Sequence, residues 1–256
     1  MKRLHKTLVN FGINLKQTYI AVTGLFWFVP SYFELIRSRK KSSQYFEIKL
    51  LPIFHDRLET SGVMSGHYFH QDLLVAQKIF KNNPLNHLDI GSSIYGFVSH
   101  VASFRQIDIL DIRDNKSQVS NIKFKKVDLM DISQVESIEK YDSISCLHVI
   151  EHFGLGRYGD KIDFDGYILG LENIAKLQTK GGIFYFGTPI GKPRIYFNAH
   201  RVFDPQYILA ILEQYYTLQE FHYVDDNGNL NTNIQLKEFN SDSLDYGCGI
   251  FIFKRK

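Results

Sequence analysis

The chain has 256 residues, of which 44% are hydrophobic and 22% are charged. This length supports one main hydrophobic core with an appendage, and the composition excludes a fibrous or disordered protein. The net charge of +3 hides an asymmetry, because residues 1–41 carry eight lysines and arginines against the single acid Glu34. Positive charge concentrated at one end argues against a nucleic-acid-binding protein.

A run of 17 residues without a charged side chain lies between Lys16 and Glu34. As a helix it would reach about 26 Å, a little less than a hydrocarbon core of about 30 Å, and Pro30 should shorten it. Its aromatic rings and basic flanks favour peripheral contact with a membrane surface; the alternative is a helix packed on the main domain. No small-residue cleavage site follows the run, so we do not expect secretion.

The chain changes character twice, which predicts a basic, aromatic-rich segment over 1–42, an irregular connection over 43–68 and one domain over 69–256. In this domain we expect helices over 69–80, 92–103, 167–177 and 205–215, and strands over 87–91, 106–112, 123–129, 141–150, 181–189, 217–224 and 247–254. Alternating strands and helices predict an α/β fold with a doubly wound, mostly parallel sheet. The last two strands have no helix between them and should pair antiparallel.

The first strand leads from Asp89 into Gly91, Ser92, Ser93 and Gly96. Glycine after a strand lets the backbone turn sharply and approach a ligand, although a plain turn would use it equally well. Ser93 replaces the second glycine of the dinucleotide fingerprint. This departure and the antiparallel ending disfavour an NAD-linked reductase.

The next two strands also end in acids. Asp111 ends the second strand, where a carboxylate can accept two hydrogen bonds from a ribose; the alternative is a solvated strand-end acid. Asp128 and Leu129 close the third strand, where an adenine amino group could lie. Together these positions predict a nucleoside site at the carboxyl ends of the strands.

The fourth strand ends in His148, Glu151 and His152. An imidazole with a pKa near neutrality can remove a proton from an acceptor hydroxyl, so both histidines are candidate general bases. The alternative is that the three residues anchor the loop.

We assign a second polar group, formed by Arg157, Arg194, His200 and Arg201, to substrate binding. Arginine suits the phosphate or carboxylate of an activated sugar, and a solvated loop is the alternative.

No metal is expected. Cys146 and Cys248 lie far apart in apolar runs, which fits neither a thiolate zinc motif nor a disulfide framework and favours a reducing compartment. Asp163, Asp165 and Glu172 partly match a calcium loop, but Lys161 stands at its first position. Asp165 as the N-cap of the following helix explains this pattern better.

The segments LDIGSSIYG (88–96), ILDIRD (109–114), KVDLMD (126–131), YDSISCLHVIEHF (141–153) and GGIFYFGTP (181–189) resemble the successive motifs of class I S-adenosylmethionine-dependent methyltransferases. The resemblance implies a Rossmann-like sheet and S-adenosyl-L-methionine as cofactor. It places the glycine turn at the methionine part, Asp111 at the ribose and Asp128 at the adenine.

More narrowly, GHYFHQDLLVAQKI (66–79), DIGSSIYGFV (89–98) and HFGLGRYGD (152–160) resemble an uncharacterised bacterial family that accompanies surface-polysaccharide biosynthesis. This implies methyl transfer to a small-molecule or glycan acceptor by a cytoplasmic protein, peripheral at the inner membrane. The alternative is an inactive methyltransferase-like scaffold in a polysaccharide assembly complex.

Overall fold

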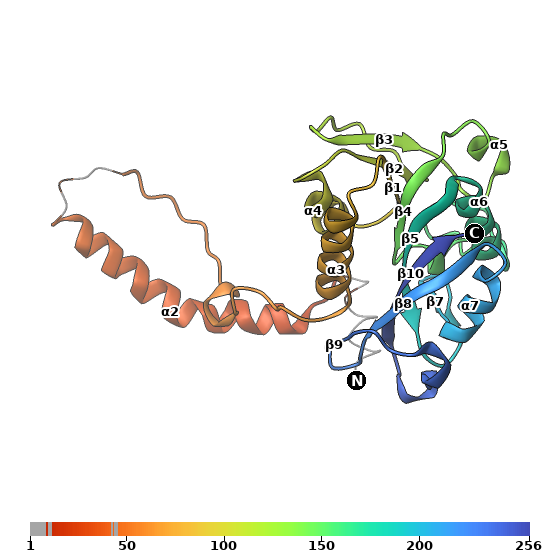
Figure 1. The fold of residues 1–256 in the computed structure, drawn as a ribbon. Helices are drawn as coiled ribbons and strands as arrows, with labels where there is room; N and C mark the ends of the chain where they lie inside the picture. The colour runs from red at the N-terminus through yellow and green to blue at the C-terminus, as the bar shows by residue number, and fades with distance from the viewer. Residues whose placement is uncertain (1–8, 10–11, 42, 44–45) are drawn as a thin grey trace. The chain divides into compact units, whose positions relative to one another are not determined.

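The computed structural model describes residues 9, 12–41, 43 and 46–256 (Figure 1). The chain separates into two compact units, Met1–Val63 and Met64–Lys256. The sequence boundary at Ser42 and the basic residues Lys2, Arg3 and Lys6 lie outside the described residues. The division of the chain into three regions therefore stays a prediction.

In the first unit, helix α2 spans Leu15–Arg39 and the short 3-10 helix η1 spans Asp56–Leu58. The expectation that Pro30 shortens the apolar helix is wrong, because α2 continues through this residue for 25 residues. A proline removes one intrahelical hydrogen bond, and the flanking turns are enough to carry the helix past it. At about 1.5 Å per residue α2 is roughly 37 Å long, so by length and composition it can cross a membrane.

In the first unit, aromatic side chains pack together beside Gly24 of α2. The ring of Phe54 fills the space where a Cβ at Gly24 would lie, and its centroid is 5.6 Å from that of Phe28 and 6.3 Å from that of Trp27. The guanidinium of Arg57 lies 4.7 Å from the centre of the Trp27 ring. The chain after α2 thus covers one side of this helix within its own unit.

The second unit is built on an eight-stranded sheet in the order β3-β2-β1-β4-β5-β10-β8-β9 (Figure 1). Its strands are β1 (His87–Ile90), β2 (Ile107–Asp111), β3 (Ile122–Lys126), β4 (Tyr141–Leu147), β5 (Gln178–Ile190), β8 (Tyr216–Val224), β9 (Leu230–Asn231) and β10 (Gly247–Arg255). The five adjacent strands β3, β2, β1, β4 and β5 pair in parallel, whereas β10 pairs antiparallel with both β5 and β8. The predicted doubly wound α/β fold with an antiparallel ending is confirmed.

Helices cover both faces of this sheet (Figure 1). The helical elements of the second unit are α3 (His67–Asn82), η2 (Ile94–Val98), α4 (Ser99–Ala102), α5 (Ile132–Val135), η3 (Ile150–His152), α6 (Gly166–Lys176), α7 (Pro205–Leu212), η4 (Leu236–Glu238) and η5 (Ser241–Ser243). Neighbouring strand residues alternate between two buried clusters, so Cys146 packs with α6 and α7, while Leu147 packs with α3.

The structure corrects several predicted elements. The third strand ends at Lys126 and the fourth at Leu147, so Asp128 and His148 lie in the loops that follow. The helix expected over 92–103 is a π-helical turn, η2, followed by the single turn of α4. A small hairpin of β6 (Arg194–Tyr196) and β7 (His200–Val202) was not predicted.

Candidate active site

The loop after β1 turns sharply at Gly91. This residue has φ +59°, and a Cβ here would lie 3.1 Å from a methyl group of Val149. Its N–H donates to the carbonyl of Leu110 at the end of β2. Both conditions favour glycine, so the turn brings backbone close to the carboxyl ends of β1, β2 and β4.

Asp89 holds this turn from below. Its side chain is fully buried and accepts hydrogen bonds from the backbone and hydroxyl of Ser92 at 2.9 and 2.6 Å and from the Ser145 hydroxyl at 2.6 Å. Burial raises the pKa of Asp89 to about 6, against the effect of these hydrogen bonds. We therefore regard Asp89 as a positioning residue for the turn.

Gly96 also has a role different from the predicted one. A Cβ at this position would lie 2.3 Å from a carboxylate oxygen of Asp72 on α3, and Gly96 lines a cavity with Asp72 and His100. Ser93 instead lines the candidate site, and its hydroxyl caps η2 by accepting from Gly96 N–H at 3.3 Å. Close packing of η2 against α3 explains the glycine.

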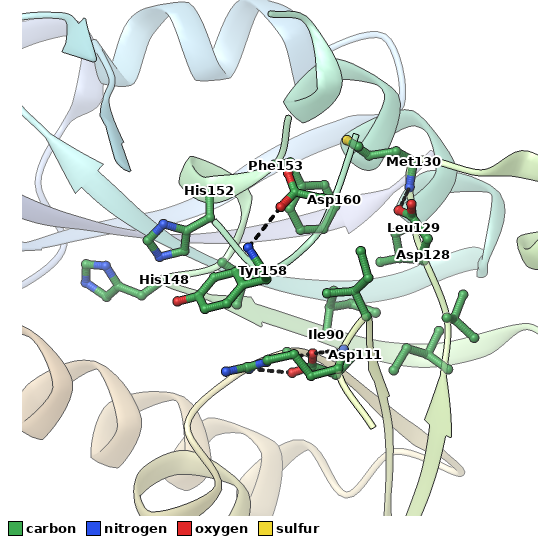
Figure 2. A pocket seen from close by; sticks show the side chains of 16 residues that line it. Ile90, Asp111, Asp128, Leu129, Met130, His148, His152, Phe153, Tyr158 and Asp160 are labelled. Carbon is green, nitrogen blue, oxygen red and sulfur yellow. Dashed lines mark hydrogen bonds and ion pairs between the residues drawn. The ribbon is translucent and has the colours of Figure 1, made fainter. Parts of the chain in front are cut away.

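Two adjoining cavities open at the carboxyl ends of the strands. The first encloses about 570 Å³ when space open to solvent is counted, and it is lined by residues at or after the ends of β1, β2, β3 and β4 (Figure 2). The second encloses about 960 Å³ when space open to solvent is counted. Five residues line both cavities, namely Gly91, Arg113, His148, His152 and Tyr158. The predicted strand-end residues therefore meet at one continuous depression.

The first cavity contains the predicted nucleoside residues. Asp111, Asp128 and Leu129 line it together with the apolar side chains of Ile90 and Val127. One carboxylate oxygen of Asp128 accepts from Met130 N–H at 2.9 Å, which fixes the side chain at the rim. Acids above an apolar floor suit a ligand with a flat apolar ring and polar edges.

Asp111 is paired with a residue that the sequence reasoning did not consider. Arg113 donates to its two carboxylate oxygens at 2.9 and 2.6 Å, and the Arg113 backbone N–H donates at 2.8 Å. The Arg113 guanidinium also lies 4.7 Å from the centre of the Tyr158 ring. A ribose at Asp111 would therefore share this carboxylate with Arg113 or displace it.

His148 and Glu151 form a buried pair beside both cavities. His148 Nδ1 lies 2.9 Å from Glu151 Oε1, and both side chains are almost completely buried. Burial alone would lower the pKa of His148, but Cys248 and Glu151 raise it well above its ordinary value. A histidine that keeps its proton near neutral pH is a poor general base.

His152 is better suited to that task. Its Nδ1 lies 2.6 Å from the carbonyl oxygen of Ala199, so Nδ1 carries the proton and Nε2 has the lone pair. Burial lowers the pKa of His152, although Glu151 acts in the opposite direction. The ring lines both cavities, and Figure 2 shows it at the first.

The four predicted substrate residues divide into two pairs. Arg157 and His200 line the second cavity, and Arg157 donates to the Ala199 carbonyl at 3.0 Å. Arg194 lies in the β6–β7 hairpin and donates to the carbonyl of Asp245. Arg201 is only 3% exposed and donates to the carbonyls of Phe153 and Phe164. Arg201 therefore holds the loop after β4 from behind the cavities, which corrects its assignment to substrate contact.

Sequence reasoning missed the aromatic wall of the second cavity. It consists of Tyr68 on α3, Tyr95 in η2, Tyr158 in the loop after β4 and Tyr246 before β10. The Tyr68 and His148 ring centroids are 5.0 Å apart, and those of His200 and Tyr246 are 5.2 Å apart. These tyrosines come from distant segments, so no local motif links them.

Solved structures similar to this chain include three described as methyltransferases. The N-methyltransferase NodS from Bradyrhizobium japonicum WM9, solved with S-adenosyl-L-homocysteine, has a TM-score of 0.49 and 15% identity, and the match covers 74% of this chain and 88% of that chain. An S-adenosylmethionine-dependent methyltransferase from Clostridium acetobutylicum ATCC 824 has a TM-score of 0.49 and 13% identity, covering 73% of this chain and 91% of that chain. The 1,6-didemethyltoxoflavin-N1-methyltransferase from Burkholderia thailandensis has a TM-score of 0.48 and 14% identity, covering 72% of this chain and 78% of that chain. At these values the matches transfer no residue roles and no activity to this chain.

No curated protein matches the sequence. A family model described as "Caenorhabditis protein of unknown function, DUF268" matches residues 95–246, which is more than half of the chain. The match covers the strands from β2 to β9 and most of both cavities, and its description contains nothing about polysaccharides. The chain belongs to this DUF268 family.

Proposed function

We propose that this protein binds S-adenosyl-L-methionine in the first cavity and transfers its methyl group to an acceptor in the second. The observation that carries the proposal is the joining of the two cavities at the carboxyl ends of β1, β2 and β4, with Gly91, His148 and His152 shared between them. A nucleoside in the first cavity would direct its reactive end toward these shared residues. Open α/β sheets bind their ligands at this edge.

The residues present fit the cofactor. Asp111 and Asp128 supply carboxylates at the rim, while Ile90, Val127 and Leu129 supply an apolar floor for a flat base. The turn at Gly91 gives backbone access for the methionine part. Bound S-adenosyl-L-methionine would supply an electrophilic methyl group on a sulfonium.

The protein's contribution to the transfer is alignment and proton removal. In-line displacement needs the acceptor atom about 3 Å from the methyl carbon, and enclosure between two cavity walls favours this geometry. His152 presents Nε2 as the basic atom because Ala199 fixes the proton on Nδ1. We assign general-base help to His152, while His148 and Glu151 hold the loop that carries it.

The walls of the second cavity favour a small-molecule or glycan acceptor. Tyrosine rings can stack on the apolar face of a sugar, and Arg157 and His200 can hold an anionic or hydroxyl group. An inactive methyltransferase-like scaffold is the competing function. It would bind the cofactor and yield no S-adenosylhomocysteine with any acceptor.

Calorimetric titration of the full-length protein with S-adenosylmethionine and S-adenosylhomocysteine tests the proposal. We expect both ligands to bind one site, and NADH and ATP at equal concentration to produce no comparable heat. Absence of binding by both sulfur nucleosides would overturn the assignment. Binding without turnover over a broad acceptor panel would favour the scaffold.

We further propose that α2 contacts an anionic membrane surface. Phe26 and Phe33 are 81% and 55% exposed, and only 6% of an 18-residue apolar window of α2 is buried. Arg37, Lys40 and Lys41 follow the apolar stretch near the carboxyl end of the helix. Apolar insertion and attraction to anionic lipid would act together at such a segment.

Vesicle sedimentation tests the membrane proposal. The wild type should sediment with vesicles that contain anionic lipid and should partly dissociate at high salt, because salt screens only the charge contribution. A Phe26→Ser/Phe33→Ser variant should bind less at every salt concentration, whereas Phe46→Ser, an exposed aromatic outside α2, serves as the control. The proposal would be overturned if the wild-type protein did not sediment with these vesicles.

A further inference from the structure

The structure assigns a metal-binding site to His67, His148 and Cys248. We propose that these residues bind one divalent transition-metal ion, with zinc as the best match to two imidazoles and a thiolate. Each of the three side chains offers one ligand atom, and these atoms lie within 4.8 Å of one another. The site does not depend on cofactor binding, so it is independent of the proposed methyl transfer.

The ligands come from three distant elements. His67 is the first residue of α3, His148 directly follows β4 and Cys248 is the second residue of β10. The sheet places β4 and β10 on either side of β5, and α3 packs across this part of the sheet. Sequence spacing between cysteines excluded zinc because it could not show this meeting of one cysteine with two histidines.

His148 is oriented as metal-binding histidines are. Its Nδ1 lies 2.9 Å from Glu151 Oε1, and its Nε2 is buried without a hydrogen-bond partner in the described part of the chain. Only 3% of the side chain is exposed. A carboxylate that accepts from one ring nitrogen orients the ring, so that the other nitrogen can bind a metal ion once the ion displaces its proton.

The other two ligands are also held in place. The ring of His67 lies between His148 and Tyr246, at centroid distances of 5.4 and 5.2 Å. Cys248 is fully buried, and its Sγ lies 3.5 Å from Gln71 Oε1. A buried thiol beside two imidazoles becomes a thiolate when a cation binds, and binding then releases protons.

Three protein ligands leave one position open in a tetrahedral site, which is the arrangement of catalytic zinc. Ideal tetrahedral geometry would separate the ligand atoms by about 3.4–3.6 Å, so side-chain movements of about 1 Å would close the site. Because His148 also lines the second cavity, an ion here would lie at that cavity's wall. There it could bind an oxygen or sulfur atom of a small ligand.

Cobalt(II) titration of the metal-free, full-length protein tests the site. We expect one equivalent to bind and to produce a thiolate-to-cobalt charge-transfer band, which one equivalent of zinc then removes. Cys248→Ser should abolish the band, and His67→Gln should weaken cobalt binding at least tenfold. Cys146→Ser is the matched control, because this second cysteine is equally buried but packs in the core on the other face of the sheet.

The proposal is overturned if the wild type gives no band, or if the band survives Cys248→Ser. Circular dichroism identifies a variant that fails to fold. His67 is only partly buried, so His67→Gln keeps the proposal testable if Cys248→Ser does not fold. Unchanged cobalt affinity of His67→Gln would also overturn it. Cofactor calorimetry on the same samples separates failure of this site from failure of the proposed methyl transfer.

Discussion

The two cavities of the second unit are built in different ways. The first is lined mostly by residues at or just after the ends of β1, β2, β3 and β4, joined by Tyr158 and Asp160 from the loop after β4. The second takes Tyr68 from α3, Tyr158 from a loop, His200 from β7 and Tyr246 from the segment before β10. One cavity is a consequence of sheet topology, and the other depends on how distant loops pack.

The supports beneath the two cavities differ in the same way. Below the first, Ser145 donates to Asp89, which also accepts from Ser92 in the turn after β1, and all three side chains are buried. Beside the second, His152 and Arg157 both bond to the single carbonyl of Ala199. Substitutions near the first cavity should therefore change stability and cofactor binding, whereas those near the second should change turnover.

The largest effect should follow His152→Ala. Loss of a general base should lower turnover by about 10²–10⁴-fold with an acceptor that supports the reaction. Cofactor affinity should change by less than about twofold, because the cofactor contacts are assigned to Asp111, Asp128 and the turn at Gly91. Release of S-adenosylhomocysteine and calorimetry measure the two quantities. His55→Ala, an exposed histidine in the first unit, is the control.

Full turnover by His152→Ala would show that alignment alone carries the reaction. In that case the second cavity would only bind and orient the acceptor, without removing its proton. The same result with His148→Ala is expected to be harder to interpret, because this side chain is buried against Glu151 and its loss disturbs the loop.

The residues beneath the first cavity can be tested through His87, whose protonation should make the free energy of unfolding depend on pH. It is buried between the hydroxyls of Ser143 and Ser145, and burial lowers its pKa to about 3. The unfolded chain binds this proton near pH 6.5 and the folded protein does not, so stability contributed by neutral His87 is lost as pH falls from 6.5 toward 3. The full titration corresponds to roughly 3–5 kcal/mol.

His87→Gln should therefore flatten the pH dependence of the unfolding free energy in this window, measured by urea denaturation. His55→Gln, an exposed histidine, should leave the dependence unchanged. Asp89 acts in the opposite sense, because its pKa is raised to about 6 and its protonated form favours the folded state. Identical pH profiles for wild type and His87→Gln would refute the buried, neutral assignment.

Asp111→Ala should produce the next largest effect, on cofactor binding. A carboxylate that accepts two hydrogen bonds from a ribose contributes roughly 2–4 kcal/mol, which is about 30- to 700-fold in Kd. Calorimetry with S-adenosylhomocysteine measures it. The matched control is Asp114→Ala, an exposed acid in the same loop. Equal affinities for both variants would remove Asp111 from the ribose.

Much of the first cavity could be predicted, because a strand end is a local feature of sequence. A short apolar run that stops at a glycine or acid, as at Gly91 and Asp111, places that residue at the sheet edge wherever the rest of the chain goes. The antiparallel last pair followed in the same way from the missing helix between two strands. Strand ends were less certain, so β4 was predicted to continue beyond His148.

The second cavity could not be predicted, because its residues meet only through packing. Arg201 shows why residue type alone misleads: an arginine near the predicted site suggests a substrate ligand, yet Arg201 lies in β7 and its guanidinium is buried against backbone carbonyls. The meeting of Cys248 with His67 and His148 has the same origin. In both cases the sequence showed which residue types were present, but it did not show how deeply the side chains are buried or which groups they contact.

The smallest effect should follow Arg113→Ala, and it decides how the first cavity works. Arg113 pairs with Asp111 in the structure, but 52% of its side chain is exposed, so the pair should contribute less than about 1 kcal/mol. A ribose can then replace the guanidinium at little cost, and Kd for S-adenosylhomocysteine should change by less than about threefold, toward tighter binding. Calorimetry on Arg113→Ala beside Asp111→Ala measures the difference. If Arg113→Ala instead weakens binding as much as Asp111→Ala does, Arg113 is the ligand contact and Asp111 acts by holding it. The strand-end acid would then be a positioning residue, and both cavities would depend on loop packing.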